Sequence, residues 1–227
     1  MGSDPRFADT VSEQTCRRLR DDIVFGRLAP GRKLRLERLR ADYDVSVATL
    51  REVLPRLASE GLIRFETQKG FEVSPVSAGD LAEISDMRIL LECHAAEASL
   101  AMGDLDWEAS LVAAHHRLSR MEARMMAGDR SVTAEWKRYD RAFHTALIAA
   151  CGSDELLATY DRIFDRFLRY QMLLVMFRGQ VAAQEHHDLL AAALDRDVRA
   201  VRRLLTRHIS ACIDYTVQHG LLAEEGA

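Results

Sequence analysis

The sequence has little of what interrupts or cross-links a chain: four prolines, four cysteines and no long apolar run in 227 residues. The cysteines are scattered without the close pairs of zinc ribbons, so they indicate neither such a site nor a disulfide framework. The longest apolar run, residues 172–177, is far too short to cross a bilayer. The N-terminus lacks the apolar segment of a secretory signal. We therefore expect a cytoplasmic protein without a membrane span.

Composition and charge indicate a folded chain with two unlike parts. Hydrophobic residues make up 48% and charged residues 29% of the sequence, which excludes a disordered or collagen-like chain. The net charge is -4, yet residues 1–76 carry +2 and the remainder carries -6. The first third can therefore face phosphate, whereas the rest is unsuited to it.

The first 76 residues are predicted to form three helices and a two-stranded hairpin. Apolar residues at helical spacing predict the helices, and short alternating runs around a polar turn predict the hairpin. The helices are expected over 12–25, over 37–43 and over about fourteen residues ending at Gly61, the hairpin turns at 66–70, and Ser74-Pro75-Val76 is the expected linker.

From Ser77 onward only the helical period is present. Glycine-containing breaks separate six predicted helices, and short loops between helices are typical of an antiparallel bundle. The sequence thus predicts a mainly α protein, with a winged helix-turn-helix domain over 1–76 and an all-helical domain over 77–227. The six helices are expected over 77–102, 106–127, 132–150, 153–177, 181–195 and 198–219.

A winged helix-turn-helix places its second helix in the major groove of DNA. Arginine on that helix can bond guanine through two hydrogen bonds, hydroxyls can reach bases or phosphates, and a glycine at the hairpin tip allows close approach. Other arginines can contact phosphates and fix the register. Winged helices also serve as protein-binding modules, and surface arginines are commonly only solvated. The expected DNA contacts are Arg35, Arg38, Arg40, Ser46, Thr49, Arg51, Lys69 and Gly70.

Four motifs of this first domain are Leu28-Ala29-Pro30-Gly31, residues 45–54, residues 57–63 and Lys69-Gly70-Phe71-Glu72-Val73. Together they resemble the GntR family of bacterial transcriptional regulators, which implies DNA binding. The family commonly has a DNA-reading arginine after the serine of the recognition helix, where this chain has Val47. Pro55 is expected to remove a hydrogen bond from that helix and to kink it.

Four polar residues of the second domain lie where the helical period calls for apolar ones. Asp140 and His144 are spaced i, i+4 on one apolar stripe, so they project from one inward face. His186 and His208 lie in register with the apolar residues of two other helices. Three histidines and a carboxylate can hold zinc, nickel or manganese. The alternatives are core histidines bonded to the backbone, and His115 as a rival ligand.

Arg88 is a fifth polar residue on an apolar helix face. A buried guanidinium needs an anion, because an unpaired buried charge is costly. An internal salt bridge with Glu92, one turn further on, would satisfy it. The alternative is a carboxylate ligand, which arginine binds through two hydrogen bonds.

The second domain carries the motifs Arg88-x-x-Leu91-Glu92, Asp140-x-x-Phe143-His144-x-x-Leu147, Glu185-His186 and Arg207-His208-Ile209. They resemble the FCD domain of the FadR subfamily, an all-helical bundle that binds small organic acids. In metal-containing members an aspartate and three histidines at these positions hold a divalent ion. The resemblance therefore implies metal ligation by Asp140, His144, His186 and His208, and places Arg88 in the ligand pocket.

The two resemblances imply a homodimeric, ligand-responsive transcriptional regulator. A two-fold dimer matches a palindromic operator. The expected cofactor is zinc, with nickel or manganese as alternatives. The expected effector is a small organic acid, a dicarboxylate or a hydroxy acid, that binds the metal and Arg88 and lowers the affinity of a repressor for its operator.

A metal-dependent hydrolase is the alternative function, because a centre of three histidines and an aspartate can also activate water. Such an enzyme needs a general base near the metal, and Glu185 and His187 are the candidates in the sequence. The N-terminal winged helix argues against an enzyme.

Overall fold

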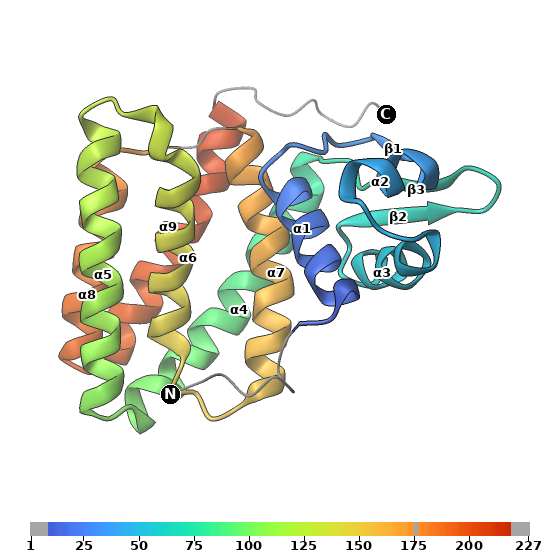
Figure 1. The fold of residues 1–227 in the computed structure, drawn as a ribbon. Coiled ribbons are helices and arrows are strands. Elements are labelled where there is room, and N and C mark those ends of the chain that lie inside the picture. The colour runs from blue at the N-terminus through green and yellow to red at the C-terminus, as the bar shows by residue number, and fades with distance from the viewer. Residues whose placement is uncertain (1–8, 175–176, 219–227) are drawn as a thin grey trace. The chain divides into compact units, whose positions relative to one another are not determined.

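The structure is a computed structural model that describes residues 9–174 and 177–218. The chain divides into two compact units, Met1–Val76 and Ser77–Ala227. Helices dominate both units, and one small sheet belongs to the first (Figure 1). The predicted mainly α class is confirmed. Within the described ranges, no helix is both long and apolar enough to cross a membrane.

The first unit begins with a helix whose start is fixed by its own side chains. Thr10 accepts a hydrogen bond from the Glu13 amide, and the Glu13 carboxylate accepts one from the Thr10 amide, which satisfies two amides that the helix leaves unpaired. The elements of this unit are α1 (Val11–Val24), β1 (Lys33–Leu34), α2 (Leu36–Tyr43), α3 (Val47–Ser59), β2 (Ile63–Glu66) and β3 (Gly70–Val73).

The sheet has three strands in the order β1-β3-β2, and both pairs are antiparallel. The predicted hairpin is β2 and β3, in which Ile63 pairs with Val73. The sequence missed β1, where Lys33 pairs with Glu72, because two residues are too short to show an alternating pattern. Helices α1 and α3 pack against each other, and Leu19 of α1 and Leu50, Leu54 and Leu57 of α3 are fully buried, which holds α3 in place.

The second unit contains six α-helices within the part of the chain that the structure describes. They begin within one residue of the predicted starts and end within four residues of the predicted ends. Residues 175–176 and 219, which belong to predicted helices, lie outside the described residues. The helices are α4 (Ala78–Met102), α5 (Leu105–Met126), α6 (Thr133–Ile148), α7 (Asp154–Leu173), α8 (Gln180–Leu194) and α9 (Val198–Gln218), with a 3-10 turn, η2 (Arg130–Val132), before α6.

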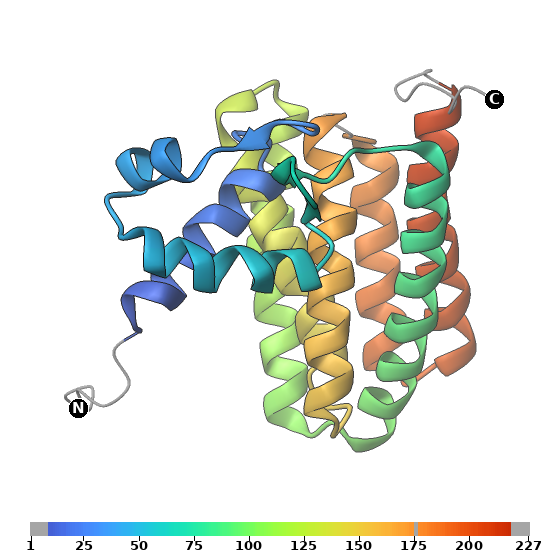
Figure 2. The ribbon, with the colours of Figure 1, turned by 90° about the vertical axis from the view of Figure 1, so that its right-hand side faces the viewer.

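The six helices form a bundle (Figure 2). Its interior contains buried polar side chains, among them Asp140, His144 and His186. Helix α4 packs against α9 and α7, while α5 packs against α6 and α8. Phe143, Tyr160, Phe164 and Phe167 are completely buried between them. This packing brings inward-facing charged and polar side chains from different helices into one region, which contains the candidate metal ligands.

Candidate functional site

The turn between α2 and α3 sets the start of the predicted recognition helix. Helix α2 ends at Tyr43. The next residue, Asp44, has a left-handed φ of 53°, a conformation that Asp adopts more readily than most residues. Ser46 then caps α3, because its Oγ accepts a hydrogen bond from the Thr49 amide at 3.0 Å. The hydroxyls of Ser46 and Thr49 also bond each other at 2.9 Å. Each hydroxyl still has hydrogen-bonding capacity for the predicted contact with DNA.

The other predicted DNA contacts are at the surface of the first unit. Arg38 pairs loosely with Asp42 at 3.6 Å, and Lys69 pairs with Glu66 at 2.7 Å. Gly70 has a φ of 81°, which a side chain would disfavour. The exposed residues of the predicted set are Arg35, Arg38, Arg40, Ser46, Arg51 and Lys69, whereas Thr49 and Gly70 are partly buried.

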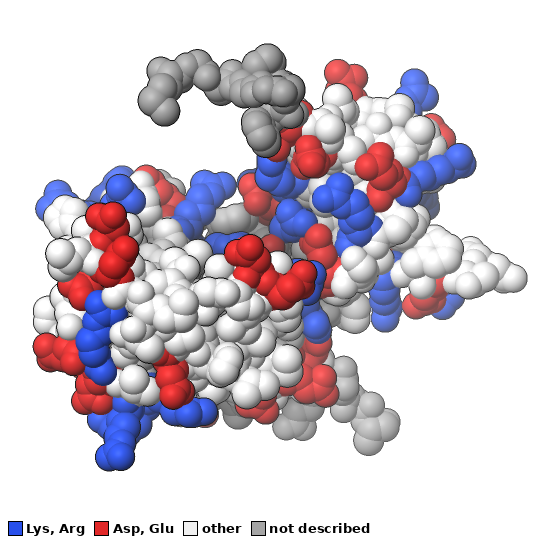
Figure 3. Space-filling model, turned by 90° about the horizontal axis from the view of Figure 1, so that it is seen from below, with Lys and Arg blue, Asp and Glu red and all other residues white. Residues whose placement is uncertain are grey.

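One face of the molecule mixes charges of both signs. Figure 3 shows basic and acidic side chains interspersed on the face that it presents. This face therefore carries no single large field of positive charge.

Two departures from the expected recognition helix are visible in α3. Val47 occupies its first position and is half-buried, so it offers no hydrogen bond to a base. The helix continues through Pro55 to Ser59 without ending at the proline. Pro55 lies on the exposed side, where the Arg51 carbonyl that lacks its usual amide partner can bond water.

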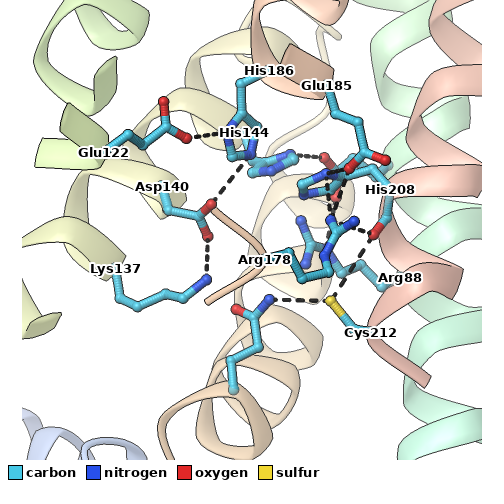
Figure 4. A network of polar contacts seen from close by, with 12 residues as sticks. Arg88, Glu122, Lys137, Asp140, His144, Arg178, Glu185, His186, His208 and Cys212 are labelled. Atoms are coloured by element: carbon cyan, nitrogen blue, oxygen red, sulfur yellow. Dashed lines mark hydrogen bonds and ion pairs between the residues drawn. The ribbon is translucent and has the colours of Figure 1, made fainter. Parts of the chain in front are cut away.

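Asp140, His144, His186 and His208 converge in the interior of the second unit (Figure 4). All four are buried, and each offers a ligand atom within 4.8 Å of the others. The residues come from α6, α8 and α9. The imidazole ring centres of His186 and His208 are 4.7 Å apart, and those of His144 and His208 are 5.2 Å apart. The predicted set is therefore brought together in one cluster.

A carboxylate holds each of the three imidazoles by its Nδ1 atom. The Nδ1 to oxygen distance is 2.5 Å for His144 and Glu92, 2.6 Å for His186 and Glu122, and 2.8 Å for His208 and Glu185. A carboxylate accepts the Nδ1 proton, which leaves Nε2 with its lone pair. The atoms His144 Nε2 and His186 Nε2 are buried without a hydrogen-bond partner among the described residues.

Asp140 is held in the complementary way, by a cation. Lys137 Nζ lies 3.5 Å from Asp140 Oδ2. The second oxygen, Oδ1, lies 3.3 Å from His186 Nε2. These two atoms do not meet the geometry of a hydrogen bond, and both are potential ligands for one ion.

The electrostatic surroundings favour neutral imidazoles at two of the three positions. Burial lowers the pKa of His144 and holds that of His208 well below its ordinary value. For His186, burial is outweighed by the neighbouring carboxylates of Asp140 and Glu122, which raise its pKa to about 8. Burial is likewise outweighed at Asp140, where Lys137 above all keeps the carboxyl pKa well below its usual value. A metal bound at neutral pH would displace a proton from His186.

Arg88 is 1% exposed and donates from Nε to Glu92 Oε2 at 2.9 Å, which is the salt bridge considered above. Its guanidinium carbon lies 4.4 Å from the ring centre of Phe164 and 4.5 Å from that of Phe167. Tyr160 donates to the same Glu92 oxygen at 3.1 Å. Arg88 Nη2 has no hydrogen-bond partner within the described ranges, so one donor stays available.

The donor set fits a divalent ion. Ligand atoms bound to one ion at about 2.1 Å lie at most about 4.2 Å apart, so only a small contraction separates the cluster from a coordination shell. The unpaired imidazole nitrogens supply the observation that favours an ion, because buried polar atoms rarely lack partners. Hydrogen bonds from each histidine to a carboxylate are also typical of metal centres.

Sequence reasoning missed part of this network. Glu122 lies on the apolar stripe of α5, between Leu118 and Met125, so its spacing could have revealed it. Glu185 was considered only as a base, yet it bonds both His208 and Arg178 at 2.8 Å. Arg178 lies outside any helix and gave no periodic signal. His115 is not one of the four clustered residues.

Comparison with known proteins gives two domain matches. Residues 83–211 match the FCD domain, and residues 11–73 match the gntR family of bacterial regulatory proteins. The HTH-type transcriptional regulator BphR of Paraburkholderia xenovorans is 37% identical, over 98% of this chain and 96% of its own. The HTH-type transcriptional repressor GlaR of Escherichia coli is 35% identical, over 84% of this chain and 89% of its own.

A solved structure shares the fold. The E. coli protein McbR/YncC superposes with a TM-score of 0.79 at 22% identity. The match covers 94% of this chain and 100% of that chain. At this identity the likeness concerns the fold alone, namely a small winged unit and a helical bundle.

The outer carboxylates generate a test of the cluster. We expect Glu122→Gln to weaken zinc affinity about 10- to 100-fold, because the amide holds the His186 imidazole less well than a carboxylate. Competition with a chromophoric chelator measures this affinity. The control is Glu83→Gln on the exposed face of α4. Equal zinc affinity in wild type and Glu122→Gln would contradict the assignment.

Proposed function

The chain belongs to the GntR family of bacterial regulatory proteins and is a transcriptional regulator with a DNA-binding domain and an FCD domain. We propose that a small organic acid binds at the centre formed by Asp140, His144, His186 and His208. Binding of the acid changes the affinity of the protein for operator DNA. The relatives are regulators rather than enzymes. Glu185 is also engaged by His208 and Arg178, which leaves it unsuited as a general base.

One observation carries this proposal: unsatisfied polar atoms gather inside the bundle. His144 Nε2, His186 Nε2 and Arg88 Nη2 are all buried without a hydrogen-bond partner among the residues described, and the three residues lie in one region of the interior (Figure 4). Two of them are lone-pair donors suited to a metal, and the third is a cationic hydrogen-bond donor suited to a carboxylate. A metal ion with a carboxylate ligand would satisfy all three.

The protein's own residues would divide the work of binding. Asp140 and the three histidines would hold the ion, while Glu92, Glu122, Glu185 and Lys137 orient these ligands. The ion would act as a Lewis acid that binds an oxygen of the acid. Arg88, fixed by Glu92 and by two phenylalanine rings, would bond the acid through Nη2.

The DNA side of the proposal involves the first unit. Arg51 would read a base, and the arginines of α2 with Lys69 would contact phosphates. A homodimer would read a palindromic operator through two such units. We propose a repressor, because GlaR and a further relative, RspR of E. coli, are named as repressors.

Two substitutions separate the two activities. Arg51→Ala should weaken binding to the DNA upstream of its own gene by about 1 to 3 kcal/mol, while zinc and acid binding stay intact. His144→Ala should do the opposite, sparing DNA binding but removing zinc and the response to acids. Fluorescence anisotropy with labelled DNA measures the DNA affinity, and the same measurement with a panel of mono-, di- and tricarboxylates measures the response to acids.

The control for Arg51 is Arg56→Ala, which removes an exposed arginine from the last turn of the same helix. The proposal fails if acids that bind the zinc-loaded protein leave its DNA affinity unchanged. It also fails if His144→Ala responds to acids as wild type does.

A hydrogen-bonded latch connects the centre with the residues that follow the linker. Tyr170 accepts from the Ser77 amide at 3.1 Å and donates to Asp80 Oδ2 at 2.7 Å, so the end of α7 holds the start of α4. Arg166 also bonds Asp80, at 2.7 Å. Gln171, which directly follows Tyr170 in α7, lines a small cavity that His186 and His208 also line. A ligand that shifts this turn of α7 would move the latch.

Tyr170→Phe removes only the hydroxyl of the latch. We expect the variant to bind zinc and acid as wild type does, while the change in DNA affinity caused by the acid falls at least several-fold. The control is Tyr139→Phe on α6, which also removes a tyrosine hydroxyl but leaves the latch intact. An unchanged acid response in Tyr170→Phe would rule out this route.

A further inference from the structure

Helix α5 has one side that faces away from the rest of the bundle. Its inward side packs against α6 and α8, and Figure 1 shows the helix at the edge of the bundle. The outward side carries apolar side chains in a row: Leu105 is 79% exposed, Val112 is 43% exposed and Met126 is 43% exposed. Contiguous apolar surface that a folded protein leaves exposed commonly marks an interaction site.

The residues between these three are small or polar. Ala109, His116 and Ala123 are exposed on the same side of α5, and Ser119 is half-buried there. At 3.6 residues per turn, all seven side chains lie within about 60° of one line along the helix. Small side chains in such a row allow another helix to approach closely. The outward face of α5 therefore has the form of a helix-packing surface.

The charges beside this row are divided along the length of α5. Asp106 lies in the first turn, whereas Arg117, Arg120 and Arg124 lie in the second half. Helical geometry places all four on the same flank of the row. Asp106, Arg117 and Arg120 form no ion pair within the described ranges, and Arg124 pairs with Asp129 at 2.7 Å. The flank therefore has an acidic end and a basic end, and three of its four charges lack an ionic partner.

A second copy of α5 in antiparallel orientation matches this face. Two-fold symmetry keeps the charged flanks of both helices on one side and sets the acidic end of each against the basic end of the other. Asp106 then lies opposite Arg124 of the partner subunit. In the same register, Leu105 lies opposite Met126 of the partner subunit. A parallel pair would instead bring like charges together, which is unfavourable.

We propose that the outward face of α5 joins the helical units of two chains, with the two α5 helices antiparallel about a two-fold axis. This rests on the proposed function, which requires a homodimer but leaves open which face joins the copies. An apolar centre with a charged rim is typical of interfaces between proteins. On the inward side of the same helix, Glu122 bonds His186 at 2.6 Å, so the contact lies one helix away from the candidate metal centre.

One apolar substitution on each of two helices tests the face. Val112→Glu puts a charge near the middle of the row, and we expect it to raise the Kd of the dimer at least tenfold in sedimentation of the full chain. The control is Leu90→Glu on α4, where Leu90 is 59% exposed, and this variant should keep the wild-type Kd. An unchanged Kd in Val112→Glu overturns the inference but leaves the proposed homodimer standing. A wild-type chain that sediments as a monomer overturns both.

Charge reversal distinguishes loss of the interface from misfolding. Asp106→Arg sets like charges opposite each other at two symmetric places and should raise the Kd about fivefold. Combining Asp106→Arg with Arg124→Asp restores opposite charges and should return the Kd to within about twofold of wild type. A second reversal does not rescue a misfolded chain, so this recovery identifies the pair. A double variant as weak as Asp106→Arg alone would contradict the antiparallel register.

Cross-linking locates the two-fold axis. The middle of α5 lies beside the axis in the proposed dimer, so the exposed His116→Cys variant should form an intermolecular disulfide on mild oxidation. The control is His94→Cys on the exposed side of α4, which should remain uncross-linked. Background is low because the natural cysteines are all buried, namely Cys16, Cys93, Cys151 and Cys212. A disulfide in His94→Cys but not in His116→Cys would place the contact elsewhere and overturn the inference.

Discussion

Hydrogen bonds between carboxylates and imidazoles decide what the interior of the bundle can bind. Each of the three histidines bonds a carboxylate through Nδ1, namely Glu92, Glu122 or Glu185. The three Nε2 atoms are therefore not engaged by these carboxylates and are available to bind a common ion. Without these carboxylates the imidazoles could rotate or pair with the backbone, and the lone pairs would lose their common direction. The position of the candidate centre, of Arg88 and of the adjoining cavity follows from this constraint.

The same network couples all six helices of the second unit. Glu92 comes from α4, Glu122 from α5, His144 from α6, Glu185 from α8 and His208 from α9, and Tyr160 of α7 bonds Glu92. Buried charges are costly unless they are paired, which explains why Arg88, Lys137 and Arg178 each face a carboxylate. A ligand at the centre therefore contacts a framework whose members cannot shift independently, which suits an effector domain.

Sequence reasoning reached the helices and the candidate ligand residues because both depend on spacing. Asp140 and His144 interrupt an apolar stripe at a helical interval, and His186 and His208 do the same on other helices. It offered the Arg88–Glu92 salt bridge as one of two alternatives, because these residues lie one turn apart on the same helix, but it could not reach Arg178, which lies outside the helices. The two-residue strand β1 escaped for a simpler reason, since it is defined by its pairing with β3 alone.

The proposed function requires one ion held by three imidazoles and one carboxylate. X-ray absorption spectroscopy at the zinc edge, on the zinc-loaded full chain, reports the ligands of that ion. We expect one zinc per chain, bound by nitrogen and oxygen ligands only, with the multiple scattering of three imidazoles. A spectrum with a sulfur ligand, for which Cys212 is the nearby source, or with fewer than two imidazoles, would contradict it.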